Sequence, residues 1–205
     1  MSKGLSSVLS SKISAKIPIN SSKGSEIRSL VESVFFQPTP TLDSANELDN
    51  LSLAVISFKD WGPDPICYEN LKWESQPDAF LTKLGVYYMT IIGQGCDYHH
   101  GLYGPIPVHT HPDQEAYLFG FTVHDDSVKD KRAKKTAYSA LLILFPKNLK
   151  PILHSCVETI NKLLSREIAD IKDITQLTSA TLAEIKAILK EGIFYHNTLS
   201  TLAVS

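Results

Sequence analysis

The residues with the clearest capacity for chemistry are His109, His111 and Glu115, which lie within the run HTHPDQE. Histidines at positions i and i+2 of a strand point to the same side, so both could bind one ion. A carboxylate nearby would complete a set of two histidines and one carboxylate, which suits zinc, iron or manganese. One hypothesis is therefore a metal-dependent enzyme that uses these three side chains.

The residues around these histidines favour a different interpretation. The segment is interrupted repeatedly by glycine and proline, at Gly101, Gly104, Pro105, Pro107 and Pro112. Such residues are typical of a loop, and histidines in a loop are more often solvated or locally hydrogen-bonded than bound to metal. We therefore expect no metal and no other cofactor, and keep the metal-dependent enzyme as the alternative hypothesis.

Other patterns typical of enzymes are absent from the sequence. It contains no GxSxG elbow, no GxxxxGK[ST] phosphate loop and no HExxH helix. The cysteines Cys67, Cys96 and Cys156 are far apart and form no CxxC pair, which argues against a disulfide framework or a cysteine-based zinc site. The sequence thus favours a non-catalytic protein in a reducing, cytoplasmic environment.

The charge and the apolar pattern of the chain do not favour a nucleic-acid partner or a transmembrane segment. A formal net charge of −2 gives no general reason to expect nucleic acid as a partner. No apolar run approaches the roughly 18 residues that span a bilayer, so we expect no transmembrane segment. Residues 1–25 are serine-rich with four lysines and no acid. We expect a flexible tail there, with an organellar targeting segment as the alternative.

The hydrophobic pattern divides the rest of the chain into three parts. Residues 26–50 are expected to form a short helix and a linker, residues 51–168 a folded domain, and residues 169–205 a helical extension. Strands are expected over 52–58, 65–70, 106–108, 117–123 and 137–145, and helices over 76–92, 149–164 and from 181 to about 189. The order strand-strand-helix-strand-strand-strand-helix-helix predicts an α+β fold, in which a five-stranded antiparallel sheet packs against helices.

Two features of this domain are candidates for contact with a partner. Trp61 stands beside Gly62-Pro63 at an expected hairpin turn, and a basic cluster lies in the polar loop that precedes residue 137. The natural partner of such a cluster is an acidic protein surface or, by peripheral contact, an anionic membrane. A solvated loop without a partner is the alternative. The candidate residues are Trp61, Lys131, Arg132, Lys134 and Lys135.

One partial resemblance belongs to the histidine segment. Gly104, His109, His111, Glu115 and Gly120 resemble the first motif of the cupin family, whose metal ligands include an HxH pair and a glutamate. The resemblance covers about 17 residues. The spacings differ from the family's, and no second histidine-bearing motif follows. The expected strands are also too few for the double-sheet barrel of a cupin.

A broader resemblance covers most of the domain. The order of elements from residue 51 to about 167 resembles a longin domain, to which roadblock domains are related. The segment ISFKDWGPDPICY is similar to the strand, Gly-Pro, strand opening of longin domains of the folliculin and DENN type. The loop from Asp130 to Lys134, within LFGFTVHDDSVKDKRAKKTAYSALLILFP, resembles their Asp-x-Arg-Ala-Lys-like loop between two strands.

This resemblance implies a non-catalytic interaction module. Longin and roadblock domains use a sheet edge and flanking helices to bind small Ras-like GTPases, sister domains or trafficking partners. We therefore expect this chain to bind or regulate such a GTPase, or to pair with another longin or roadblock domain as a homodimer or heterodimer. A trafficking or signalling scaffold is the expected setting, and the sheet edges are the expected place for an added partner strand.

Overall fold

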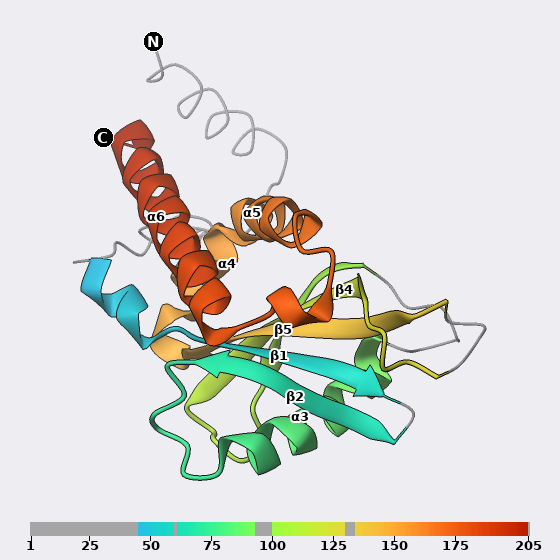
Figure 1. Cartoon of the computed structure of the whole chain (residues 1–205). Helices are drawn as coiled ribbons and strands as arrows, with labels where there is room; N and C mark the ends of the chain where they lie inside the picture. The colour runs from blue at the N-terminus through green and yellow to red at the C-terminus, as the bar shows by residue number, and fades with distance from the viewer. Residues whose placement is uncertain (1–44, 60, 93–99, 130–133, 205) are drawn as a thin grey trace, which may run out of the picture. The chain divides into compact units, whose positions relative to one another are not determined.

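The computed structural model describes residues 45–59, 61–92, 100–129 and 134–204, and the structural statements below concern these residues (Figure 1). The tail over residues 1–25 and the helix expected within residues 26–36 lie outside them. The main elements in chain order are β1 (Ser52–Lys59), β2 (Gly62–Glu69), α3 (Pro77–Ile92), β3 (Gly101–Pro107), β4 (Gln114–His124), β5 (Thr136–Pro146), α4 (Lys150–Ser155), α5 (Val157–Ala169) and α6 (Ser179–Val204). Short 3-10 turns are η1 (Ala45–Asn50), η3 (Lys147–Leu149) and η4 (Ile174–Gln176).

Strands β1 and β5 lie at the centre of the sheet because nearly all of their side chains are apolar or small. The sheet has five antiparallel strands in the order β2-β1-β5-β4-β3. Alternate residues point to opposite faces, so Leu53 and Val55 enter one core while Ala54 and Ile56 enter the other. The prediction of an α+β fold with a five-stranded antiparallel sheet is confirmed.

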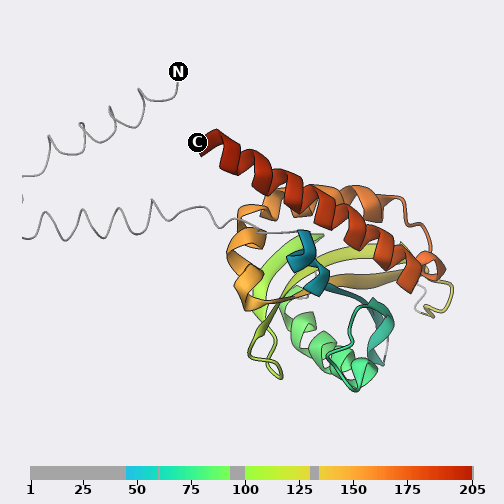
Figure 2. The same ribbon diagram turned by 90° about the vertical axis from the view of Figure 1, so that its left-hand side faces the viewer.

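Helices cover both faces of the sheet (Figures 1 and 2). Helix α3 packs on one face and buries Phe80, Leu81 and Tyr88 in the smaller core. Helices α4, α5 and α6 pack on the other face and complete the larger core. None of the helices in the described part combines the length and apolar character that crossing a bilayer requires.

Several boundaries differ from those predicted. The expected helix over 149–164 is divided at Cys156, whose φ of −101° and ψ of 9° leave the helical region, into α4 and α5. Helix α6 continues beyond residue 189 to Val204. Its residues Leu182 and Ile185 lie in the larger core, as does Leu48 from the expected linker. Helix α6 therefore packs in the same core as the sheet.

The two edge strands share an unusual feature. Strand β2 contains Pro63 and Pro65, and β3 contains Pro105 and Pro107. Proline has no amide hydrogen and is tolerated in edge strands where its nitrogen faces away from the neighbouring strand, so it removes donors from the free edge. Both edges are therefore poor templates for an added strand. The expectation that a partner extends the sheet is not supported by this geometry.

Candidate functional site

The three candidate ligands of the alternative metal site lie in different surroundings. His109 and His111 occupy the loop between β3 and β4, as the glycines and prolines of the segment indicated. The exposed His109 ring packs edge-on against Tyr87 of α3 at 4.1 Å between ring centroids. His111 packs edge-on against the rings of both Trp73 and Phe80, and its Nε2 is 3.5 Å from a carboxylate oxygen of Glu74.

Glu115 is the first buried residue of β4, and its side chain lies on the opposite face of the sheet from His111. Its Oε1 accepts a hydrogen bond of 2.9 Å from Nζ of Lys150, which begins α4. Two residues on, Tyr117 is wholly buried in the larger core, whereas His111 contacts Phe80 of the smaller core. The sheet therefore separates Glu115 from His111. Nowhere in the described residues do three His, Cys, Asp or Glu side chains converge in a way that could hold a metal ion.

This arrangement makes a clear prediction for metal content. Because the sheet separates Glu115 from His111, protein purified without a histidine tag should contain less than about a tenth of an equivalent of zinc, iron or manganese. A functional site would hold its metal tightly enough to retain it through purification. Elemental analysis by mass spectrometry measures the content directly. A stoichiometric metal that is lost in both the His109→Ala and the Glu115→Ala variants would contradict the prediction.

Three buried or partly buried side chains, Tyr117, Cys156 and Cys67, are held in their neutral forms. Burial, then the nearby Glu115 and Cys156, raises the pKa of Tyr117 to about 12. Burial also raises the pKa of the Cys156 thiol, and raises that of Cys67 to about 11. A reactive cysteine needs a lowered pKa, so neither thiol has the environment of a nucleophile. These groups serve the packing of the core rather than proton transfer near neutral pH.

A second candidate region lies at the end of the sheet where β1 turns into β2 and β4 runs into β5. Strands β1 and β5 are antiparallel, with Phe58 opposite Tyr138, so the end of β1 lies beside the start of β5. This register places the β1–β2 turn beside the loop between β4 and β5. We call the exposed residues Trp61, Lys129, Lys134 and Lys135 the hairpin-tip surface. Lys131 and Arg132, predicted for the same loop, lie outside the described residues.

A buried ion pair joins the end of β1 to the loop between β4 and β5. Lys59, the last residue of β1, donates hydrogen bonds to the Asp125 carboxylate and, at 3.0 Å, to the Ser127 hydroxyl. The side chains of Lys59 and Asp125 are only 8% and 4% exposed. The Asp125 carboxylate also accepts a hydrogen bond of 2.8 Å from the Ser127 amide. The position of the β4–β5 loop relative to the hairpin is therefore fixed by buried polar contacts, which sequence analysis missed.

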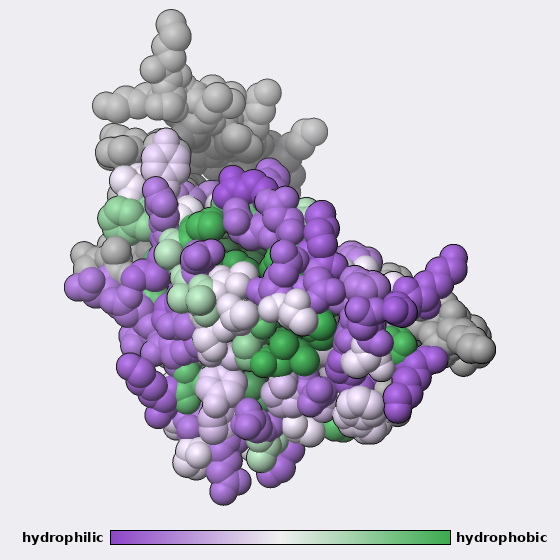
Figure 3. All heavy atoms as spheres, in the orientation of Figure 1, coloured by the Kyte–Doolittle hydropathy of each residue, from purple (hydrophilic) through white to green (hydrophobic). Residues whose placement is uncertain are grey.

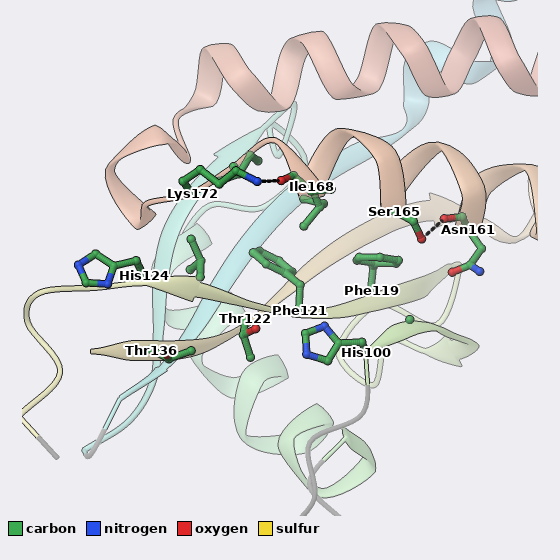
Figure 4. Close-up of a pocket in the computed structure, with 14 residues that line it drawn as sticks. His100, Phe119, Phe121, Thr122, His124, Thr136, Asn161, Ser165, Ile168 and Lys172 are labelled. Carbon is green, nitrogen blue, oxygen red and sulfur yellow. Dashed lines mark hydrogen bonds between the residues drawn. The ribbon is translucent and has the colours of Figure 1, made fainter. Parts of the chain in front are cut away.

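A groove of about 670 Å³ lies between the far part of β4 and α5 (Figure 4). Strand β3 begins opposite Gly120, so β4 continues beyond the described part of β3. In Figure 4 the rings of Phe119 and Phe121 lie between β4 and α5, and His100 and Asn161 also line the groove. Both phenylalanine rings are buried, which makes the groove shallow. It offers a surface rather than the enclosed pocket typical of a small-molecule site.

The chain matches no protein-family model, no curated protein and no solved structure. What bears on its function is therefore the geometry of its own residues.

Proposed function

We propose that this chain is a non-catalytic, longin-like interaction module that binds a small Ras-like GTPase or pairs with another longin or roadblock domain. The observation that carries the proposal is the succession of elements around the sheet. Two strands, α3, three further strands and the C-terminal helices follow one another, with α3 on one face and α4, α5 and α6 on the other. Such a module would act in the cytoplasm as part of a trafficking or signalling scaffold.

The outer face of α3 is a candidate contact surface for such a partner. Because both edge strands carry prolines, strand addition is disfavoured and a helical face becomes the more favourable contact. On α3, Val86 is 57% and Tyr87 43% exposed, although both are large and apolar or aromatic. Exposed aromatic and aliphatic side chains on a rigid helix are typical centres of binding energy in protein interfaces.

A binding assay with a matched variant tests this proposal. The full-length chain is immobilised and offered a panel of Ras-like GTPases loaded with GDP or a non-hydrolysable GTP analogue, while light scattering measures self-association. Val86→Glu should weaken the interaction at least about tenfold, because it places a charge at the centre of the contact. Lys162→Glu, on the exposed face of α5, is the control and should bind normally.

A strictly monomeric wild-type protein that binds no member of the panel would contradict the proposal. If Val86→Glu and Lys162→Glu weaken the binding of a GTPase equally, the GTPase remains a partner but α3 is not its contact surface.

A further inference from the structure

Trp61 is the most exposed large apolar side chain in the described part of the molecule. It stands at the turn between β1 and β2 with 72% of its surface accessible to solvent. The turn itself depends on Gly62, whose φ of +121° is unfavourable for other residues, and it does not require an aromatic residue at position 61. The indole therefore contributes little to folding, and its exposure points to a contact outside the domain.

Basic side chains surround the same end of the sheet. Lys129, Lys134 and Lys135 are all exposed, and the Lys59–Asp125 pair holds their loop beside the hairpin. Figure 3 shows hydrophilic side chains projecting from this end, where Figure 1 shows the β1–β2 turn and the β4–β5 loop. Between residues 129 and 135 the sequence contains five basic residues and one acidic residue.

Two acidic residues next to this loop, Asp125 and Asp126, form ion pairs within the domain. Asp125 is paired with Lys59 inside the structure, and Asp126 forms an ion pair with Lys135 at the surface. The hydrogen bond from Lys135 lowers the pKa of Asp126, so that pair stays ionised at neutral pH. The pairing of these two aspartates leaves the positive charge of Lys129 and Lys134 at the hairpin-tip surface.

We propose that the hairpin-tip surface docks this protein on anionic phospholipid membranes, with the Trp61 indole in the interface and Lys129 and Lys134 against the headgroups. Tryptophan is enriched at membrane interfaces because its ring is apolar while its N–H remains hydrogen-bonded near the headgroups. Basic residues close to an anionic leaflet each strengthen attachment, by about fivefold in affinity. The indole would contribute apolar burial in the interface, and the two lysines would contribute electrostatic attraction to anionic lipid.

The shape of the surface favours a membrane over an acidic protein. Trp61 stands at a turn, where a Cβ built on the neighbouring Gly62 would meet no atom within 4 Å, so the tip is open rather than recessed. A protein partner would need a matching pocket for one isolated indole, and such anchors usually belong to a larger apolar patch. A bilayer interface accepts a single projecting indole without a preformed pocket.

Vesicle sedimentation with the full-length chain tests the proposal. The vesicles are phosphatidylcholine alone or phosphatidylcholine with about a third phosphatidylserine, at low and high salt. We expect binding only to the anionic vesicles and weakening at high salt, because surface charges are screened. The chain has two tryptophans, and Trp73 donates a hydrogen bond to Ser52 within the domain. A blue shift of tryptophan emission on binding should therefore disappear in Trp61→Phe and persist in Trp73→Phe.

Charge variants complete the test. Lys129→Glu/Lys134→Glu should lower the affinity for anionic vesicles by more than about tenfold. The matched control Lys147→Glu/Lys162→Glu makes the same change in net charge; Lys147 follows the opposite end of β5. It should bind nearly as well as wild type. Absence of binding to anionic vesicles, equal losses in both double variants, or undiminished binding through another segment such as residues 1–25 would overturn the proposal. So would binding of the tip only to an acidic protein or polyglutamate.

Discussion

Replacing Lys59 with methionine is expected to lower the free energy of unfolding at pH 7 by about 3 kcal/mol. The substitution keeps much of the side-chain length but removes the cation from a pair in which both side chains are almost fully buried. Asp125 would then remain as a buried carboxylate whose charge is opposed only by hydrogen bonds from Ser127. Chemical denaturation monitored by far-ultraviolet circular dichroism measures the change.

The contribution of Asp125 to the free energy of unfolding should change with pH in opposite directions in wild type and in Lys59→Met. In wild type, burial raises the pKa of Asp125, but the hydrogen bonds from Lys59 and Ser127 outweigh it, and the pKa lies below its usual value. The pair therefore stabilises the fold above about pH 4, where the unfolded carboxyl titrates, and its contribution is lost as the pH falls through the lower, folded pKa. In Lys59→Met the lysine no longer opposes the rise in the Asp125 pKa that burial causes. Protonation of Asp125 at acid pH should therefore make the variant more stable than it is at neutral pH.

A second substitution separates a buried charge from a general loss of packing. Adding Asp125→Asn to Lys59→Met removes the carboxylate charge but keeps an oxygen that can accept the Ser127 amide hydrogen bond. The double variant should be more stable than Lys59→Met alone and should lack its acid recovery. If Lys59→Met is as stable as wild type at pH 7, the pair does not hold the two loops together.

The sheet was predictable because the amino-acid composition of its inner strands already indicates that both of their faces are buried. In β5 the run AYSALLILF is apolar on both faces, which indicates a strand buried on both sides without any knowledge of its neighbours. The regular 3.6-residue spacing of Phe80, Leu81, Leu84 and Tyr88 likewise identified α3. Local periodicity is enough for these elements because their environment repeats along the chain.

The candidate sites depend on register and on the sheet faces, and spacing along the chain does not determine either. His111 and Glu115 are four residues apart, yet the chain turns between them and the sheet separates them. Conversely, Lys59 and Asp125 are 66 residues apart and meet because β5 pairs with β1 on one side and with β4 on the other. The only local indication was a lysine at the end of an otherwise apolar strand, which is more often a solvated residue than half of a buried pair.

The second large effect is expected at Gly85, where α3 crosses β2. A Cβ atom at this position would lie 2.4 Å from Cβ of Pro63 and 3.1 Å from Cγ2 of Ile56. Proline cannot rotate its ring out of the way, so Gly85→Ala must displace the helix or the strand. Overpacking of this kind costs about 3 kcal/mol, while the better helix propensity of alanine returns about 1 kcal/mol. We therefore expect a net loss of about 2 kcal/mol in the free energy of unfolding.

Gly192 in α6 provides a matched control, because an added Cβ there would also lie 2.4 Å from its nearest atom. That atom is Cδ1 of Leu163, the end of a flexible side chain that can adopt another rotamer. Gly192→Ala should thus be neutral or stabilise the protein by up to about 1 kcal/mol. In a double-mutant cycle, Gly85→Ala should cost less in the Pro63→Gly background than in wild type, since the opposing Cβ is absent there. Equal losses from the two alanine variants would mean that the stiffness of the Pro63 ring does not set the position of α3 on the sheet.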